Sequence, residues 1–257
     1  MATLKETAGR WGNMTVRYDG LTVEWLGYAT ARVAAVDGPT VYTDPGRYGV
    51  LDDYWTRDGD LVLVTHDHHY DPEGIRSVAD PGATLVIYEA VDPDRIDRDV
   101  ESVESLSDDY DVIRVDDEAE FEVELDDGTV TVWTVPTYND PEGPRADADG
   151  TVPHPEGFGC GFLFSIGDRT AFWPGDGDAL DGFAELDVDL FLANIGGGDI
   201  VSDRHESADL AEGMAPELVV PIHYDTFDAL EADGEAFAGD VASRSIPAAL
   251  DERSVNR

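Results

Sequence analysis

The sequence predicts an α/β protein of the α+β type, a four-layer αββα sandwich in which two mixed β-sheets pack together with helices outside. Three observations lead to this prediction. Short apolar strands follow one another closely in the first quarter, a β-α-β unit comes next, and helices recur late among further strands. No Pro/Gly/Ser-rich linker divides the 257 residues, so we expect 1–257 to form a single domain.

The N-terminal quarter favours an antiparallel meander. Strands are predicted at 15–19, 21–26, 30–36 and 40–43, and turn signals such as Asp19-Gly20 separate them. Connections this short join antiparallel neighbours.

A β-α-β unit follows the meander. Strands at 61–65 and 84–88 flank a predicted helix at 72–78, with Asp71 at its N-cap and Pro72 at its first helical position. Further strands are predicted at 111–115, 121–125, 130–135, 161–166, 170–173, 190–195 and 218–222.

Two late segments indicate helices, and one long segment indicates neither helix nor strand. Asp203-Arg204-His205-Glu206 forms a capping box before a helix at 208–214, and 227–238 predicts another. Residues 139–158 carry no periodic apolar signal. Long insertions of this kind are functional loops or disordered, and His154 near the end of this one favours the first.

The charge of the chain is extreme. Asp and Glu number 57 against 16 Lys and Arg, which gives a net charge of −41 spread along the whole length. Such a surface repels itself unless salt screens it, and at molar ionic strength the Debye length is only about 3 Å. We therefore expect a high-salt cytoplasm, that of a halophilic archaeon, with an ordinary acidic protein as the alternative.

Charge and hydropathy also limit the partners. Nucleic acid and anionic membranes need a basic footprint that no segment supplies. No apolar run approaches the roughly 20 residues of a membrane span, and residues 1–6 lack the hydrophobic region of a signal peptide. The single cysteine, Cys160, excludes an internal disulfide and a multi-thiolate metal site. A cytoplasmic protein with a small-molecule substrate fits best, and the oligomeric state stays open.

Three of the six histidines stand together at the end of a predicted strand. The apolar run 61–64 ends in Thr65-His66-Asp67-His68-His69-Tyr70-Asp71. Side chains alternate along an extended chain, so His66 and His68 point the same way and could hold one ion. Histidine is the commonest ligand for borderline divalent ions, and the cluster therefore predicts a metal site rather than a polar turn.

Other candidate ligands also lie beside apolar strands. Asp176 follows the strand at 170–173, His223 follows the strand at 218–222, and His154 precedes the strand at 161–166. Loops gathered at one edge of a sandwich would bring them together.

Several segments, in order, resemble the metallo-β-lactamase-fold hydrolases, in the branch similar to ascorbate-6-phosphate lactonase. They are Trp25-Leu26-Gly27-Tyr28-Ala29-Thr30, Tyr42-Thr43-Asp44-Pro45, Thr65-His66-Asp67-His68, Val135-Pro136-Thr137-Tyr138-Asn139, His154-Pro155-Glu156-Gly157, Gly175-Asp176-Gly177-Asp178 and Pro221-Ile222-His223-Tyr224. The resemblance implies the αββα fold and a metal-dependent hydrolase that uses metal-activated water on an ester, lactone or phosphoester.

The resemblance also implies ligands for one or two ions, zinc or alternatively manganese. His66, His68 and His154 would hold the first ion, with Asp176 as a bridge. The second would take His223 with either His69 or Asp71, because the residues after His68 depart from the family spacing. Asp71 or Asp176 would orient the nucleophile.

These departures leave two alternatives open. The family's third histidine is replaced by Asn139, and Tyr28 replaces a histidine common in this branch. One alternative is a catalytically degenerate, metal-binding member of the fold with a binding or regulatory role. The other is an acidic binding domain without metal.

Overall fold

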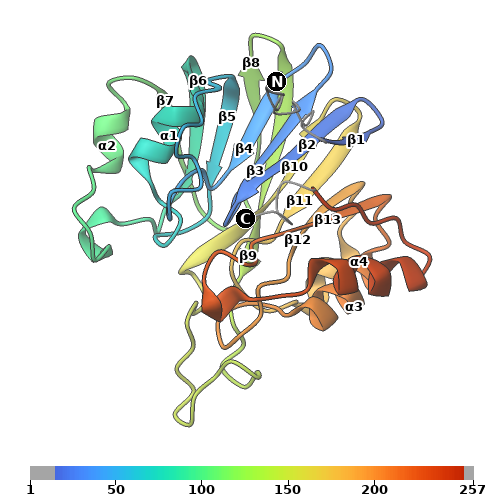
Figure 1. Cartoon of the computed structure of the whole chain (residues 1–257). Coiled ribbons are helices and arrows are strands. Elements are labelled where there is room, and N and C mark those ends of the chain that lie inside the picture. The colour runs from blue at the N-terminus through green and yellow to red at the C-terminus, as the bar shows by residue number, and fades with distance from the viewer. Residues whose placement is uncertain (1–14, 252–257) are drawn as a thin grey trace, which may run out of the picture.

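The computed structural model describes residues 15–251, and its two β-sheets pack against each other around a shared core (Figure 1). The expectation that residues 1–6 do not form a signal peptide concerns residues outside this range. The first sheet has seven strands in chain order. They are β1 (Val16–Tyr18), β2 (Leu21–Gly27), β3 (Thr30–Ala35), β4 (Thr40–Thr43), β5 (Gly59–Val64), β6 (Ala79–Tyr88) and β7 (Asp111–Val115). β1 to β4 pair antiparallel, whereas β4 to β7 pair parallel.

The second sheet has six strands in the order β13-β12-β11-β10-β9-β8. They are β8 (Glu120–Leu125), β9 (Gly128–Thr137), β10 (Gly159–Ile166), β11 (Arg169–Trp173), β12 (Leu190–Asn194) and β13 (Leu218–Ile222). β8 to β11 pair antiparallel and β11 to β13 pair parallel, so this sheet is also mixed.

Helices cover the outer side of each sheet (Figure 1). α1 (Pro72–Val78) packs on β6, and α2 (Val103–Leu106) lies on the same side of the molecule. α3 (Arg204–Met214) packs on β12 and α4 (Gly234–Ser243) on β13. Three short 3-10 helices, η1 (Pro93–Arg95), η2 (Asp181–Glu185) and η3 (Asp228–Leu230), lie in connections. The predicted αββα sandwich is confirmed.

The predicted elements match the structure closely, but β6 begins at Ala79 instead of at residue 84, α4 ends at Ser243 instead of at residue 238, and two helices begin elsewhere than predicted. α3 begins at Arg204 and not at residue 208, because the Asp203 carboxylate accepts hydrogen bonds from the backbone of His205 and Glu206 directly after the cap. α4 begins only at Gly234, since η3 and a turn occupy the first part of the predicted segment. The short helices α2, η1 and η2 were not predicted, because a helix of three to five residues is too short to show an apolar periodicity.

Large aromatic side chains fill the core. Phe162 and Phe164 of β10, Phe172 and Trp173 of β11 and Phe191 of β12 are buried. Complete burial of such a side chain contributes about 1.5–3 kcal/mol. The strands are therefore a rigid base for the loops that leave their ends.

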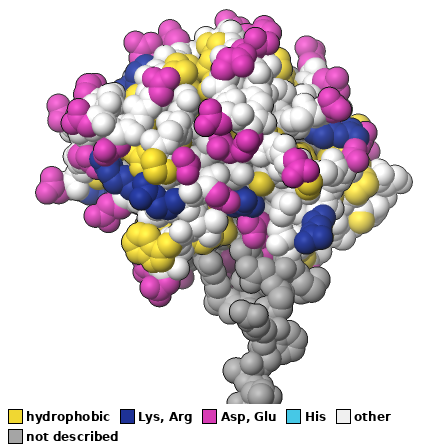
Figure 2. All heavy atoms as spheres, turned by 90° about the horizontal axis from the view of Figure 1, so that it is seen from above, with side chains coloured by type: hydrophobic (Ala, Val, Ile, Leu, Met, Phe, Trp, Pro, Cys, Tyr) yellow, Lys and Arg dark blue, Asp and Glu magenta, His cyan; other side chains and the backbone are white. Residues whose placement is uncertain are grey.

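The surface is acidic and carries few cations. Figure 2 shows Asp and Glu side chains scattered over one face, with only a few arginines among them. The charge of −41 thus belongs in large part to the exterior of a folded protein. Within residues 15–251, the helices are all too short or too polar to cross a membrane.

Candidate metal centre

The histidines after β5 lie in a turn, not in an extended strand. The backbone N–H of His69 donates to the carbonyl of His66 at 3.1 Å, which curls the chain. As a result His69 turns inward together with His66, and both are buried, whereas His68 is exposed. Asp67 faces away and pairs with Arg95 at 3.0 Å.

The two sheets meet at this turn. His66 forms an isolated bridge with Gly159, and the N–H of Cys160 donates to the carbonyl of Thr65 at 3.3 Å. A Cβ at Gly159 would lie 2.8 Å from the Cβ of His66, so only glycine allows this approach. The contact brings loops of the second sheet next to His66.

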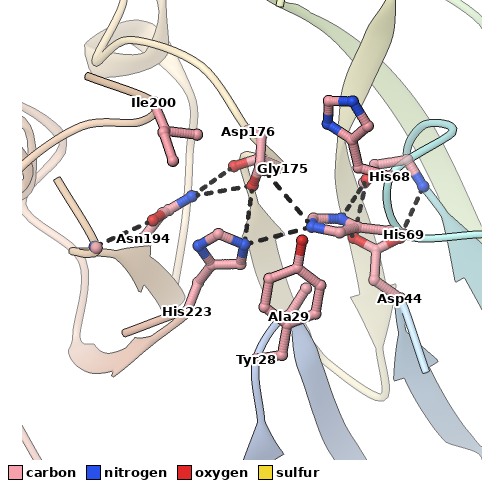
Figure 3. A network of polar contacts seen from close by, with 12 residues as sticks. Tyr28, Ala29, Asp44, His68, His69, Gly175, Asp176, Asn194, Ile200 and His223 are labelled. Carbon is pink, nitrogen blue, oxygen red and sulfur yellow. Dashed lines mark hydrogen bonds and ion pairs between the residues drawn. The ribbon is translucent and has the colours of Figure 1, made fainter. Parts of the chain in front are cut away.

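The carboxylate of Asp176, which follows β11, lies at the centre of the resulting cluster, and Figure 3 shows it between His69 and His223. Its Oδ1 lies 3.3 Å from Nε2 of His223. Its Oδ2 lies 3.7 Å from Nε2 of His66, 3.5 Å from Nε2 of His69 and 3.6 Å from Nε2 of His154. Both oxygens therefore face imidazole nitrogens.

The spacing of these donor atoms suits a metal ion. Nδ1 of His68 lies 3.2 Å from Nε2 of His154, and Nε2 of His69 lies 3.3 Å from Nε2 of His223. Ligands placed tetrahedrally at bonds of about 2.0–2.1 Å lie about 3.3 Å apart. Nε2 of His66 is buried, and no other described residue gives it a hydrogen bond. The His/Asp cluster could therefore bind a metal ion, through His66, His68 and His154 or through His66, His69 and Asp176.

Burial keeps most of the imidazoles neutral. It lowers the pKa of His66 and of His223 well below the ordinary value, and the nearby His69 lowers both further. Burial also lowers the pKa of His154 to about 3 and that of His68 to about 4. Neutral imidazoles have a free lone pair, which is the form that coordinates divalent ions.

Asp176 and His69 differ from these histidines, because their pKa values are raised. Burial raises the pKa of Asp176 to about 6. For His69, burial acts to lower the pKa, but the carboxylates of Asp176 and Asp44 outweigh it and the pKa is raised. Concentrated negative charge of this kind favours a cation in the cluster.

Asp44, at the end of β4, orients His69 and was not predicted as a site residue. Its Oδ2 lies 2.9 Å from Nδ1 of His69 and accepts from the Trp173 indole at 2.7 Å and the Thr65 hydroxyl at 2.8 Å. With Nδ1 bonded to Asp44, Nε2 of His69 is turned toward Asp176. The Asp44-Pro45 dipeptide in the family resemblance was the available signal.

Asn139 orients His154 in a similar way. The segment 138–158 contains no helix or strand, as expected, but it folds back so that Asn139 N–H donates to the His154 carbonyl at 2.8 Å. The side-chain oxygen of Asn139 lies 3.1 Å from Nδ1 of His154. Its amide nitrogen donates to Asp178 at 3.0 Å, and Asp178 pairs with the buried Arg145 at 2.7 Å. Sequence reasoning missed these three supporting residues.

The structure brings together six of the seven predicted ligands and places Asp71 elsewhere. Oδ2 of Asp71 accepts the backbone N–H of Arg47 at 2.6 Å. His69 and Asp71 were the two alternative ligands for the second ion. His69 lies in the cluster, whereas the carboxylate of Asp71 lies outside it and supports the loop after β4.

Comparisons with known proteins agree with this geometry. A family model described as a beta-lactamase superfamily domain matches residues 22–223, which include every residue from Asp44 to His223 discussed above. A UPF0173 metal-dependent hydrolase of Salinibacter ruber is 30% identical over 78% of this chain and 78% of its own length. The chain belongs to the UPF0173 metal-dependent hydrolases of the beta-lactamase superfamily.

Other similarities extend over most of this UPF0173 chain. A UPF0173 protein of Pyrococcus furiosus is 30% identical over 88% of the chain and 93% of its own length. The structure of Igni18, a metallo hydrolase from Ignicoccus hospitalis, matches with a TM-score of 0.66 over 90% of this chain and 94% of that one, at 18% identity. At this identity the likeness shows the fold, the metallo-β-lactamase fold expected from the sequence.

Proposed function

We propose that this UPF0173 hydrolase cleaves an ester, lactone or phosphoester of a small molecule, with two divalent ions held around Asp176. The position of Asp176 carries the proposal. One of its oxygens faces His223 and the other faces His66 and His154, each at 3.3–3.7 Å. A carboxylate with ligands on both sides is suited to bridge two ions, as in two-metal hydrolytic sites.

The proposed ligand sets follow the imidazole nitrogens that lie nearest each other, His68 with His154 at 3.2 Å and His69 with His223 at 3.3 Å, while Oδ2 of Asp176 faces His69 as well as His66 and His154. His66, His68 and His154 would hold one ion, and His69 and His223 would hold the other. Imidazole and carboxylate favour zinc, with manganese as the alternative. When bound, such an ion lowers the pKa of a coordinated water and polarises the substrate oxygen.

The cavity over the cluster suits a small substrate. It has a volume of about 330 Å³, and aromatic side chains, Tyr28, Tyr48 and Phe227, line it beside the cluster. The Tyr28 ring lies 4.7 Å from that of His223. Burial raises the pKa of Tyr28, so that its hydroxyl keeps its proton at neutral pH and can donate to a developing oxyanion.

We assign the orientation of the nucleophile to Asp176 alone. Asp71 was the other candidate, but its carboxylate accepts the Arg47 N–H, which suits a role in holding the loop. The resemblance of the His154-Pro155-Glu156-Gly157 segment to the lactonase branch makes lactones the first substrates to test. We further propose a single domain, working in a high-salt cytoplasm because of the charge of −41.

The test combines metal analysis with a substrate screen. Purified protein in molar KCl is loaded with zinc or manganese and assayed on lactones, phosphodiesters and thioesters. We expect about two equivalents of metal and turnover that rises with loading. His68→Ala should lose one equivalent of metal and most of the turnover. His205→Ala is the matched control, since His205 is exposed and faces Asp240 at 3.6 Å, outside the cluster.

The outcomes separate the alternatives. Bound metal without turnover on any substrate would favour a degenerate member of the fold with a binding or regulatory role. Absence of metal, with a melting temperature that a chelator leaves unchanged, would refute the ligand assignment and favour an acidic binding domain.

A further inference from the structure

Among residues 15–251, two arginines beside the metal cluster, Arg47 and Arg98, form no ion pair with a carboxylate, although the charge of Asp71 acts on Arg98. Within residues 15–251, the guanidinium of Arg47 donates to the carbonyl of His68 and, at 3.2 Å, to the hydroxyl of Tyr48. That of Arg98 donates to the carbonyl of Tyr70. In a chain with 57 acidic residues against 16 basic ones, cations without an acidic partner at a candidate active site need an explanation.

Both arginines face one cavity. It has a volume of about 320 Å³ and is lined by Arg47, Asp67, His68, Arg95, Ile96, Asp97, Arg98 and Phe158. Arg47 and His68 also line the cavity over the metal cluster, so the two cavities adjoin. The third arginine, Arg95, is already paired with Asp67 at 3.0 Å. A group bound here would lie next to the exposed histidine of the cluster.

The arrangement is costly for the protein by itself. Burial lowers the pKa of Arg98, and the positive charge of Arg47 is the next largest cause. Nε of Arg98 is buried and has no hydrogen-bond partner among the described residues. Like charges held close together raise the free energy, and an oxyanion bound between the two guanidinium groups would relieve this repulsion.

Hydrogen bonds within the protein order the side chains of Arg47 and Arg98 before any anion binds. Carbonyl groups of the turn after β5 hold both guanidinium groups, and the Arg47 backbone is held by Asp71. Phe158 adds an apolar wall, with its ring 5.2 Å from that of His68. A guanidinium pair ordered in this way is suited to carboxylate or phosphate oxygens.

We propose that Arg47 and Arg98 bind an anionic group of the substrate, a carboxylate or a phosphate, beside the His68 edge of the metal cluster. The inference rests on the proposed function, because it takes the reacting bond to lie over the cluster. It narrows the substrate class to anionic esters, lactones or phosphoesters. A local cationic site also counters the repulsion that a protein of charge −41 exerts on anions.

The first test compares matched substrates on the metal-loaded protein in constant molar KCl. γ-Butyrolactone is compared with the same ring carrying a carboxylate on its γ-carbon, and methyl butanoate with monomethyl succinate. We expect the anionic member to have the higher kcat/KM. The anionic-to-neutral ratio should fall about tenfold or more in Arg98→Gln and Arg47→Gln. Arg98→Lys should recover part of it.

Arg57→Gln is the control. It makes the same change in net charge, but Arg57 is exposed and donates to the carbonyl of Ala79, away from both cavities. The anionic-to-neutral ratio of kcat/KM in Arg57→Gln should equal that of the wild type. Equal ratios in all variants would overturn the proposal, while turnover of the neutral members would leave the hydrolase function intact.

A binding measurement decides the case in which neither pair is hydrolysed. Inorganic phosphate is titrated calorimetrically into metal-loaded wild type and the same variants. A Kd raised about tenfold in Arg47→Gln and Arg98→Gln, but not in Arg57→Gln, supports the anion site even though the hydrolase proposal fails. An unchanged Kd in every variant overturns the anion site.

Discussion

Asp44 offers the sharpest test of how the cluster is held, through the substitution Asp44→Asn. The buried carboxylate accepts four hydrogen bonds, from Thr65 N–H and Oγ1 at 2.8 Å each, Trp173 Nε1 at 2.7 Å and His69 Nδ1 at 2.9 Å. An asparagine amide has one oxygen and one NH2 group, so in either orientation at least one buried donor faces another donor. An unsatisfied buried donor costs about 1–3 kcal/mol, and the charge-assisted bonds weaken in addition. We expect the metal-free protein to lose about 2–4 kcal/mol of unfolding free energy.

The metal affinity should change as well, because His69 loses the carboxylate that turns its Nε2 toward Asp176. Loss of such a partner typically reduces affinity about 10- to 100-fold. Calorimetric zinc titration in molar KCl should show one equivalent weakened by that factor. Asp189→Asn is the control, since Asp189 accepts from Thr170 N–H at 2.7 Å near the start of β11, the strand whose other end leads to Asp176. It should lower stability only. Wild-type affinity for both equivalents in Asp44→Asn would refute the reasoning.

Three further predictions follow from the geometry and the charge. Asp71→Ala should lower the free energy of unfolding by about 1–2 kcal/mol, because the Arg47 N–H loses its acceptor. Elemental analysis should find the same metal content as in the wild type. Loss of one equivalent of metal would instead make Asp71 a ligand. The pKa of His154 is lowered to about 3, so its contribution to metal-free stability is present above about pH 6.5 and is lost as the pH falls toward 3. Between pH 6.5 and 4.5 the wild type should lose about 2 kcal/mol more unfolding free energy than His154→Gln in denaturant titrations, and an equal loss in both proteins would contradict this. Dilution from molar KCl at constant metal content should lower the melting temperature, because the charge of −41 is then unscreened, and an unchanged value would exclude salt dependence.

Local patterns in the sequence determined the architecture and half of the candidate site. Strand periodicity and turn residues depend on neighbours within about ten positions, which is why the strands could be predicted with most ends close to the observed ones, although β6 begins at Ala79 instead of at residue 84. The same patterns put His66, Asp176 and His223 at strand ends. Strand ends gather at one edge of a sandwich, so their convergence was predictable without knowing which atoms would meet.

Only the tertiary structure decided which side chains face the centre and what supports them. The choice between His69 and Asp71 depended on a turn, and on Asp44 contributed by the neighbouring strand β4. The pairing of Asn139 with His154 depended on how a loop without periodicity folds back. The meeting of Arg47 and Arg98 likewise depended on two separate loops. These contacts join residues far apart in the chain, and their geometry is set by packing across the two sheets, which no local pattern encodes.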